Sequence, residues 1–195
     1  MAKGRPRAFD AAKALDTALH LFWEHGYEGT SISMLADAMN IKIPSLYSAF
    51  GNKEELFLKA VQRYGELNGC MYHDSLKKKT AYEVVESILM GEVELVTRKT
   101  TPDGCLMLTS ALATSPDSER IRKFISDMRA MPEKWIAERL KQAQKDGDLP
   151  KSADPAALAF YIMTVNWGIA AQAKSGATRA ELTTLVKHVL KHWPN

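Results

Sequence analysis

The chain has few of the features that mark secreted or metal-binding proteins. Its 195 residues include only two cysteines, Cys70 and Cys105, too few for the disulfide scaffold of a small secreted domain. We therefore expect two buried thiols that pack as small apolar side chains, with a redox-sensing pair as the less favoured alternative. The five histidines show no metal-ligand spacing with the cysteines, so the sequence predicts no metal site.

Sequence motifs of common enzyme classes and of targeting segments are also lacking. The sequence has no glycine-rich phosphate loop, no Gly-x-Ser-x-Gly and no His-Glu-x-x-His, so it predicts neither an enzyme nor a bound cofactor. The basic start MAKGRPRAF is not followed by the apolar segment of a signal peptide. The longest apolar run, residues 156–163, is much shorter than a membrane span. We expect a cytoplasmic protein.

The chain does contain the composition of an ordinary globular protein, with 46% hydrophobic and 25% charged residues. A net charge of +3 is only weak support for nucleic-acid binding. The placement of the basic residues is more informative, because Lys3, Arg5 and Arg7 gather at the N-terminus and Lys42 and Lys53 lie near the motif described next. This distribution favours DNA binding more than the total charge does.

Residues 31–56 read as two short helices joined by a tight turn and followed by the start of a third. Asn40 can adopt the left-handed conformation of a helix-ending turn, and Pro44 suits the first turn of the next helix. Leu46 and Phe50 would bury that helix against the first one. This is the helix-turn-helix arrangement, whose second helix enters the DNA major groove. The apolar stripe of the first helix consists of Ile32, Leu35, Ala36 and Met39.

The same segment resembles the TetR-type (TetR/AcrR-type) transcriptional regulators over about the first third of the chain. Three positions depart from the family pattern: Asn40 replaces a common Gly, Lys42 a common Ser, and Ala49 a larger His or Tyr. The resemblance implies a DNA-binding homodimer, commonly a repressor, released by a small-molecule effector. The resemblance is carried by Thr30, Ser31, Leu35, Ala36, the turn Asn40-Ile41, Leu46, Tyr47, Phe50, Lys53, Glu54 and Leu56.

A regulator of this kind needs contacts to phosphates and to base edges. We expect Tyr47 and Lys53 to contact phosphates, Lys42 to contact bases, and Arg5 and Arg7 to reach the minor groove. A core role for Tyr47 and a solvated-surface role for the two lysines remain as alternatives. The predicted DNA-binding residues, within and around a helix-turn-helix from Ile32 to Gly51, are Arg5, Arg7, Thr30, Ser31, Lys42, Ile43, Pro44, Ser45, Tyr47 and Lys53.

Helical periodicity extends over almost the whole chain and predicts an all-α protein with two domains. Residues 1–52 form the DNA-binding domain, with a connecting helix that starts there and continues to about residue 66. Residues 67–195 form the ligand-binding and dimerisation domain. The expected helices outside the motif cover residues 8–25, residues 53 to about 75, residues 81–98, a long helix from Ser115-Pro116 to Gly147, residues 155–174, and a last helix after Thr178.

The helix over residues 155–174 is apolar on nearly every side, so it must be covered on every side. One chain can cover only part of it, and we expect the last two helices to pair with those of a second copy in a four-helix interface. Trp167 and Ala171 are the residues expected to face outward.

The resemblance also implies an apolar pocket for an effector in the second domain, for which no charged partner stands out. A core role is the alternative for each candidate. The main functional alternative is a helical dimeric protein–protein adaptor that does not bind DNA. The candidate pocket residues are Cys105, Met107, Met128, Trp135, Met163, Asn166 and Trp167.

Overall fold

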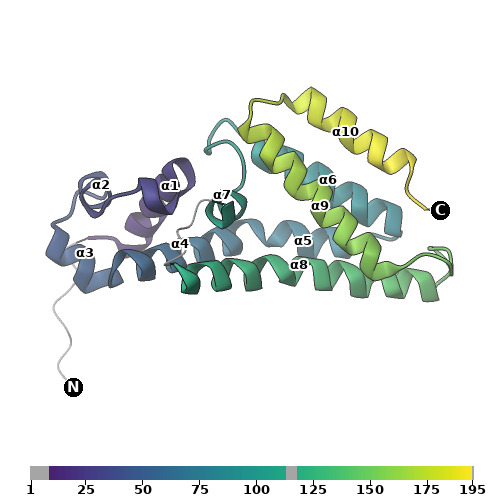
Figure 1. Cartoon of the computed structure of the whole chain (residues 1–195), viewed down its shortest axis with the longest axis horizontal. Coiled ribbons are helices and arrows are strands. Elements are labelled where there is room, and N and C mark those ends of the chain that lie inside the picture. Colours follow the sequence, from purple (N-terminus) through teal and green to yellow (C-terminus); the bar gives the residue numbers. More distant parts are fainter. Residues whose placement is uncertain (1–8, 113–117, 195) are drawn as a thin grey trace, which may run out of the picture.

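The computed structural model describes residues 9–112 and 118–194, and all regular secondary structure in those residues is helical. Three helices form one end of an elongated molecule, and a helical bundle forms the other (Figure 1). The predicted all-α class, with an N-terminal helix-turn-helix and a C-terminal helical domain, is confirmed.

The N-terminal end contains α1 (Ala11–Gly29), α2 (Ile32–Ala38) and α3 (Ile43–Phe50). The first helix begins three residues later than predicted, because the Asp10 side chain accepts hydrogen bonds from two amides of the first turn. Gly26, with φ of 73°, interrupts α1 directly after residue 25, where the predicted helix ends. The turn between α2 and α3 contains Asn40 with φ of 52°, the left-handed conformation that the sequence predicted.

Aromatic rings fill the core behind the helix-turn-helix. The ring of Phe57 contacts those of Phe22 and Tyr27 with centroid distances of 5.0 Å each, both near edge-to-face. Leu35, Leu46 and Leu56 are fully buried beside them. These contacts fix α2 and α3 on the scaffold of α1 and of the next helix, so the position of α3 is set by dense packing.

The connection between the two ends is α4 (Lys53–Asn68), followed directly by α5 (Cys70–Leu76). Asn52 and Glu55 form a capping box at the start of α4. The single helix predicted to run to about residue 75 is instead two consecutive helices that meet at Gly69, whose amide donates to the carbonyl of Gly65 over 2.7 Å. In Figure 1, α4 runs from the helix-turn-helix into the bundle.

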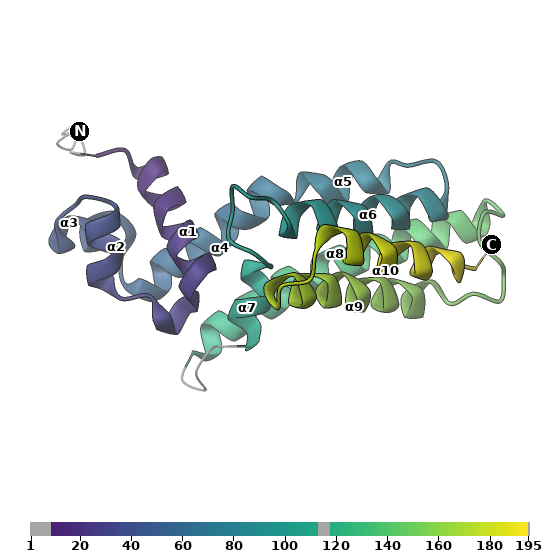
Figure 2. The ribbon, with the colours of Figure 1, turned by 90° about the horizontal axis from the view of Figure 1, so that it is seen from above.

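The bundle consists of α6 (Ala81–Val96), α7 (Leu106–Leu112), α8 (Glu119–Lys145), α9 (Pro155–Lys174) and α10 (Arg179–Lys191). Capping boxes start α6 at Thr80 and α10 at Thr178, and Asp154 caps α9. The predicted start of the long helix at Ser115-Pro116 lies outside the described residues, and Pro132 is accommodated inside α8. Figure 2 shows α9 and α10 side by side over α6 and α8.

Among the described residues, α9 alone is long and apolar enough to cross a membrane by length and composition. The apolar run of residues 156–163, which was judged too short for a span, is only part of this longer apolar helix. The helix packs against α6 and α8, and 39% of its most apolar window is buried. A helix of this composition is also typical of a protein core, and its remaining exposed side is considered below.

Candidate functional site

The helix α3 has one buried face and one exposed face. Leu46 and Phe50 are buried as predicted, and α3 packs against α2. On the opposite side Ile43 and Tyr47 are 41% and 47% exposed. Pro44 stands in the first turn and leaves no amide unsatisfied there. The exposed position of Tyr47 argues against a core role, and the face carries groups that can meet a phosphate or a base edge. The polar and apolar side chains on this face and its approach are Lys42, Ile43, Pro44, Ser45 and Tyr47.

Three of the other predicted DNA-binding residues have structural contacts of their own. Thr30 is fully buried, and its hydroxyl donates to the carbonyl of Gly26 over 2.7 Å, so a phosphate contact by its side chain is contradicted. The exposed Ser31 caps α2 by accepting from the amide of Met34 over 3.1 Å. Lys53 is half-buried, with its Nζ 4.3 Å from the centroid of the Tyr27 ring.

Burial lowers the pKa of Lys53, while the charge of Glu28 opposes that change. The cation–π contact holds this ammonium group near the start of α4. It can still present a positive charge to a phosphate from this position. Arg5 and Arg7, the predicted minor-groove arm, lie outside the described residues.

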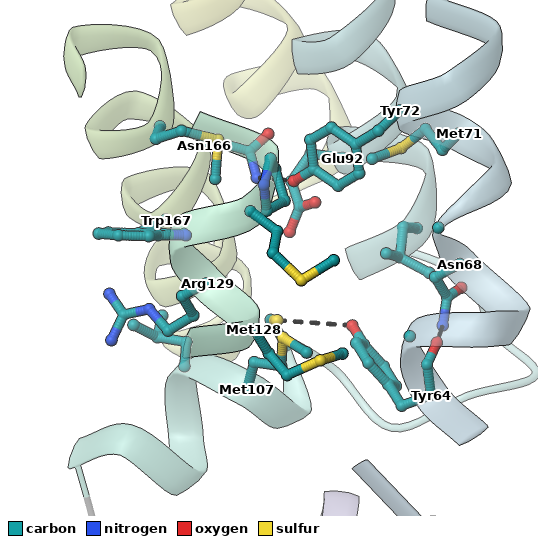
Figure 3. Close-up of a pocket in the computed structure, with 18 of the residues that line it drawn as sticks. Tyr64, Asn68, Met71, Tyr72, Glu92, Met107, Met128, Arg129, Asn166 and Trp167 are labelled. Atoms are coloured by element: carbon teal, nitrogen blue, oxygen red, sulfur yellow. Dashed lines mark hydrogen bonds between the residues drawn. The ribbon is translucent and has the colours of Figure 1, made fainter. Parts of the chain in front are cut away.

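A cavity of about 300 Å³ lies inside the bundle (Figure 3). Its wall comes from α4, α5, α6, α8 and α9 and from the segment around the start of α7. The structure brings all seven predicted pocket residues into this one wall, which are Cys105, Met107, Met128, Trp135, Met163, Asn166 and Trp167. A volume of this size suits a small organic molecule.

Sequence reasoning missed the part of the wall that comes from α4, α5 and α6, including Tyr64, Met71, Tyr72 and Glu92. The most important omission is Glu92, which is 4% exposed. A signal for it exists, because it continues the inward stripe of Val85, Ile88 and Leu89 at helical spacing. A carboxylate in such a stripe predicts a buried charge. The sequence interpretation, in which no charged partner stood out, therefore overlooked Glu92.

Polar side chains from three helices meet at one end of the cavity (Figure 3). The amide nitrogen of Asn166, on α9, donates to the Tyr72 hydroxyl, on α5, over 3.3 Å. The Asn166 Oδ1 atom is buried and has no hydrogen-bond partner within the described chain. Burial raises the pKa of Glu92, on α6, to about 7, although hydrogen bonding from Asn166 opposes this change. Two strong acceptors, Glu92 and the Asn166 carbonyl, thus lie together in an apolar wall.

Burial holds two tyrosines and one cysteine of the wall in their neutral forms. Burial raises the pKa of Tyr64 and of Tyr72 well above the ordinary tyrosine value. The Tyr64 hydroxyl donates to the sulfur of Cys105 over 3.5 Å. Burial raises the pKa of the Cys105 thiol to about 11, so this half-buried thiol is protonated at neutral pH. Cys70 is exposed, which contradicts the expectation of two buried thiols.

Arg129, on α8, stacks on the indole of Trp167, with the guanidinium carbon 3.7 Å from the ring centroid. Burial lowers the pKa of Arg129. Figure 3 shows its guanidinium pointing away from Glu92. Trp167 lines the cavity and is half-buried, so the expectation that it faces outward is wrong, whereas Ala171 is exposed.

The cavity and the helix-turn-helix are joined by a short chain of contacts. The Tyr64 and Trp23 rings pack edge-to-face at a centroid distance of 4.9 Å. The indole nitrogen of Trp23, on α1, donates to the carbonyl of Gly104 over 3.0 Å. Arg120, at the start of α8, forms an ion pair of 3.0 Å with Glu54, at the start of α4. A change in the cavity wall can therefore reach α1 and α4 directly.

Comparison with known proteins places these features in a family. Residues 14–60 match the family described as bacterial regulatory proteins, tetR family, and residues 83–189 match the tetracyclin repressor-like C-terminal domain. The HTH-type transcriptional repressor ComR of Escherichia coli (strain K12) is 34% identical over 194 residues, covering 98% of this chain and 92% of the relative. The uncharacterized HTH-type transcriptional regulator YezE of Bacillus subtilis (strain 168) is 29% identical, covering 82% and 83%.

Solved structures agree with these sequence matches. A cysteine mutant of the TetR family transcriptional regulator CifR, complexed with a 26-base-pair operator DNA, has a TM-score of 0.93 and 39% identity, covering 97% of this chain and all of that chain. AibR in complex with isovaleryl coenzyme A and operator DNA has a TM-score of 0.73 at 23% identity, covering 94% and 98%, and supports the fold alone.

Proposed function

Because the chain belongs to the TetR family and is a DNA-binding transcriptional regulator, we propose that it represses transcription as a homodimer on a palindromic operator. A small molecule in the cavity lined by Glu92 and Asn166 then releases it from DNA. The observation that supports this most is that one helix, α4, supplies both a packing partner of the helix-turn-helix and a wall of the cavity. Relatives named as repressors and the operator complex of a 39% identical neighbour agree with it.

The exposed side of α9 is the proposed dimer surface. Among its exposed residues, Phe160 is 59% and Tyr161 44% exposed. A soluble monomer rarely leaves such an apolar stripe uncovered. With α10, this surface would form the four-helix interface of a two-fold dimer. The exposed residues that share this face at helical spacing are Ala157, Phe160, Tyr161, Thr164, Gly168 and Ala171.

On DNA, each protomer inserts α3 into the major groove, with the two α3 helices about 34–36 Å apart, or slightly more, for half-sites one turn apart. Tyr47 and Lys53 bind phosphates, Ser31 contacts a phosphate while it caps α2, and Lys42 and Ser45 read base edges. Ile43 and Pro44 supply apolar contacts to thymine methyl groups. The N-terminal arm with Arg5 and Arg7 adds minor-groove contacts.

Release follows from the contacts between the two domains, which we place at residues 1–52, with α4 between them, and 67–195. A ligand that moves Tyr64 also moves its ring partner Trp23 and therefore α1. The movement tilts α4 and changes the separation of the two α3 helices, so one operator half-site is lost. A ligand achieves this only by binding the released conformation more tightly than the DNA-bound one.

We propose no catalytic role for the cavity. Nucleophilic catalysis needs an ionised or activated group, and burial keeps the Cys105 thiol and the Tyr64 and Tyr72 hydroxyls protonated. A protein that acts on chromosomal DNA works in the cytoplasm, which is where we place it.

Binding of DNA from the region upstream of the protein's own gene, measured by fluorescence anisotropy over a series of salt concentrations, tests the DNA-binding role. We expect affinity to fall steeply with salt because phosphate contacts release counterions. Tyr47→Phe should weaken binding to operator and random DNA alike, whereas Lys42→Ala should weaken the operator more, by about 1–3 kcal/mol. DNA binding that does not weaken with salt would favour the protein–protein adaptor. If Lys42→Ala weakens binding to operator and random DNA equally, Lys42 does not read bases.

A further inference from the structure

Glu92 is a buried acid for which the described residues supply no cation. The ion pairs found in the described part of the chain do not include it. Arg129 lines the same cavity, but its guanidinium stacks on Trp167 and points away from Glu92 (Figure 3). A buried carboxylate without a cation is unfavourable in its charged form, so this position gains most from a ligand that brings a positive charge.

A second observation at the same place concerns Asn166. Its side chain is buried, with 2% of the residue exposed, and its Oδ1 atom lacks a hydrogen-bond donor within the described chain. Its nitrogen donates to the Tyr72 hydroxyl and is also the hydrogen-bond donor toward Glu92. The group that Asn166 still lacks is therefore a donor, not an acceptor. Both Glu92 and Asn166 therefore favour a ligand group that donates hydrogen bonds, and an ammonium group does so while carrying a positive charge.

The remaining wall suits the apolar part of an organic cation. Aromatic rings attract cations over their faces, and Trp167 already holds the Arg129 guanidinium at 3.7 Å in this way. Methionine side chains are polarisable and adapt to irregular shapes. The wall contains both kinds of side chain in Tyr64, Tyr72, Trp135, Met107, Met128 and Met163.

From these observations, and resting on the proposed effector site, we propose that the cavity binds a hydrophobic organic ammonium ion. The ammonium group lies against the Glu92 carboxylate and donates a hydrogen bond to Asn166 Oδ1, while the apolar part lies among the aromatic and methionine side chains. The effector of the regulator is then a lipophilic amine of a size that fits about 300 Å³.

Binding of such a cation should also release a proton. Near pH 7 about half of the Glu92 side chains carry a proton, and a bound ammonium ion favours the ionised form. The other titratable groups of the wall are Tyr64 and Glu66 from α4, His73 and Tyr72 from α5, Cys105 before α7 and Arg129 from α8. Glu66 differs from Glu92 in that it pairs with Arg63 over 3.8 Å. Burial holds both tyrosines and the cysteine protonated at this pH. Proton release near pH 7 that disappears without the Glu92 carboxyl is therefore a signature of this residue.

Three compounds of nearly equal size test the charge requirement in the full-length protein: 4-phenylbutylamine, 4-phenylbutan-1-ol and 4-phenylbutyrate. Isothermal titration calorimetry should show the amine binding about tenfold or more tightly than the alcohol, with the carboxylate weakest. Titrations in buffers of different ionisation enthalpy should report about half a proton released per amine bound at pH 7. Stronger binding of the alcohol or carboxylate, or no binding of the amine, would overturn the proposal.

Glu92→Gln and Glu94→Gln form a matched pair of variants. Both residues lie on α6, but Glu94 is exposed and pairs with Arg98 over 3.9 Å outside the cavity. Glu92→Gln should lose the preference for the amine and the proton release, whereas Glu94→Gln should keep both. An amine preference that survives Glu92→Gln contradicts the inference, as does one that both variants lose.

Operator binding with and without the amine separates this inference from the proposed function. If the amine releases the operator from the wild-type protein but not from Glu92→Gln, the result supports both the cation inference and the proposed effector site. If the amine binds through Glu92 and the operator affinity does not change, the ligand class stands and the role of this cavity as an effector site fails. If the alcohol or the carboxylate releases the operator and the amine does not, the effector site stands and the cation inference fails.

Discussion

The two ends of the molecule use aromatic side chains for different purposes. At the DNA-binding end, the Phe22, Tyr27 and Phe57 rings pack on one another, and the buried Thr30 hydroxyl has a partner. At the other end, Tyr72 and Trp167 border a cavity. The buried side-chain polar atoms without a partner, among the described residues, all lie between Thr101 and Asn166.

This difference matches what each end has to do. A helix that reads DNA must be held in one position, and dense aromatic packing achieves this. A site that responds to a ligand must leave binding energy unused until the ligand arrives. The Asn166 carbonyl without a donor and the buried Glu92 without a cation are therefore typical of a ligand-binding site. A rigid scaffold has few such unsatisfied polar groups.

The strongest way to test this contrast is to truncate one side chain at each end. Phe22 is fully buried and packs edge-to-face on Phe57 at 5.0 Å, so Phe22→Ala should cost about 3–5 kcal/mol. Met128 is half-buried and borders the cavity, so Met128→Ala should cost less than about 2 kcal/mol. Urea denaturation of both variants measures the two values. Equal costs would show that the cavity end is packed as tightly as the DNA-binding end.

The next test concerns the exposed side of α9, the proposed dimer surface, which no other part of the protomer covers. A side chain at Gly168 would meet nothing within 4 Å in the protomer, so Gly168→Glu should leave the fold intact. An unpaired charge buried in the dimer interface costs several kcal/mol, and we expect monomers that lose operator binding. Sedimentation velocity checks this, with Ser126→Glu on the exposed side of α8 as the control. A normal dimer of Gly168→Glu would place the interface elsewhere.

The sequence predicted the DNA-binding end well because local signals define it. The Asn40 turn and the Asn52–Glu55 capping box depend on residues a few positions apart. The same holds for the helix starts at Asp154 and Thr178 in the bundle. Thr30 is the exception: a threonine before a helix is typical of a cap, but this side chain turns back to Gly26. Only the three-dimensional packing of α1 decides between the two.

The cavity was predicted only in part because it is built from segments distant in the sequence. Met and aromatic residues of α8 and α9 at helical spacing marked one wall, whereas Tyr64 and Tyr72 read as ordinary core residues of a connecting helix. Trp167 was assigned to the outer face as well as to the pocket. In a helix that is apolar on every side, the sequence does not show which face points to the protein core. Glu92 carried a signal, a charge within an apolar stripe, that the sequence interpretation did not use.

The buried acid at the cavity end should make stability depend on pH in a way that the DNA-binding end does not. The pKa of Glu92 in the folded protein, about 7, lies above its ordinary value of 4.5, so the folded chain holds this proton more tightly than the unfolded chain. The resulting stabilisation is fully present below pH 4.5 and is lost as the pH rises through 7, by an amount on the order of 3 kcal/mol.

Urea denaturation of the wild-type protein and of Glu92→Gln between pH 4.5 and 8 measures this contribution as the difference between the two curves. We expect Glu92→Gln to gain stability relative to the wild type as the pH rises. Since both proteins share every other titratable group, parallel curves would mean that Glu92 titrates normally and is not a strained charge in the cavity wall.

The smallest expected effect lies where the two ends meet, at Tyr64. Tyr64→Phe keeps the ring contact with Trp23 and removes only the hydrogen bond to Cys105, so stability should change by no more than about 1 kcal/mol. Operator affinity without ligand should stay the same. The amine should lower operator affinity by a smaller factor in Tyr64→Phe than in the wild type, because the hydroxyl links the cavity wall to α1 through this ring. Tyr82→Phe, at an exposed tyrosine of α6, is the control. If both variants respond to the amine like the wild type, the ligand signal does not pass through the Tyr64 hydroxyl, and the Arg120–Glu54 ion pair becomes the next connection to remove.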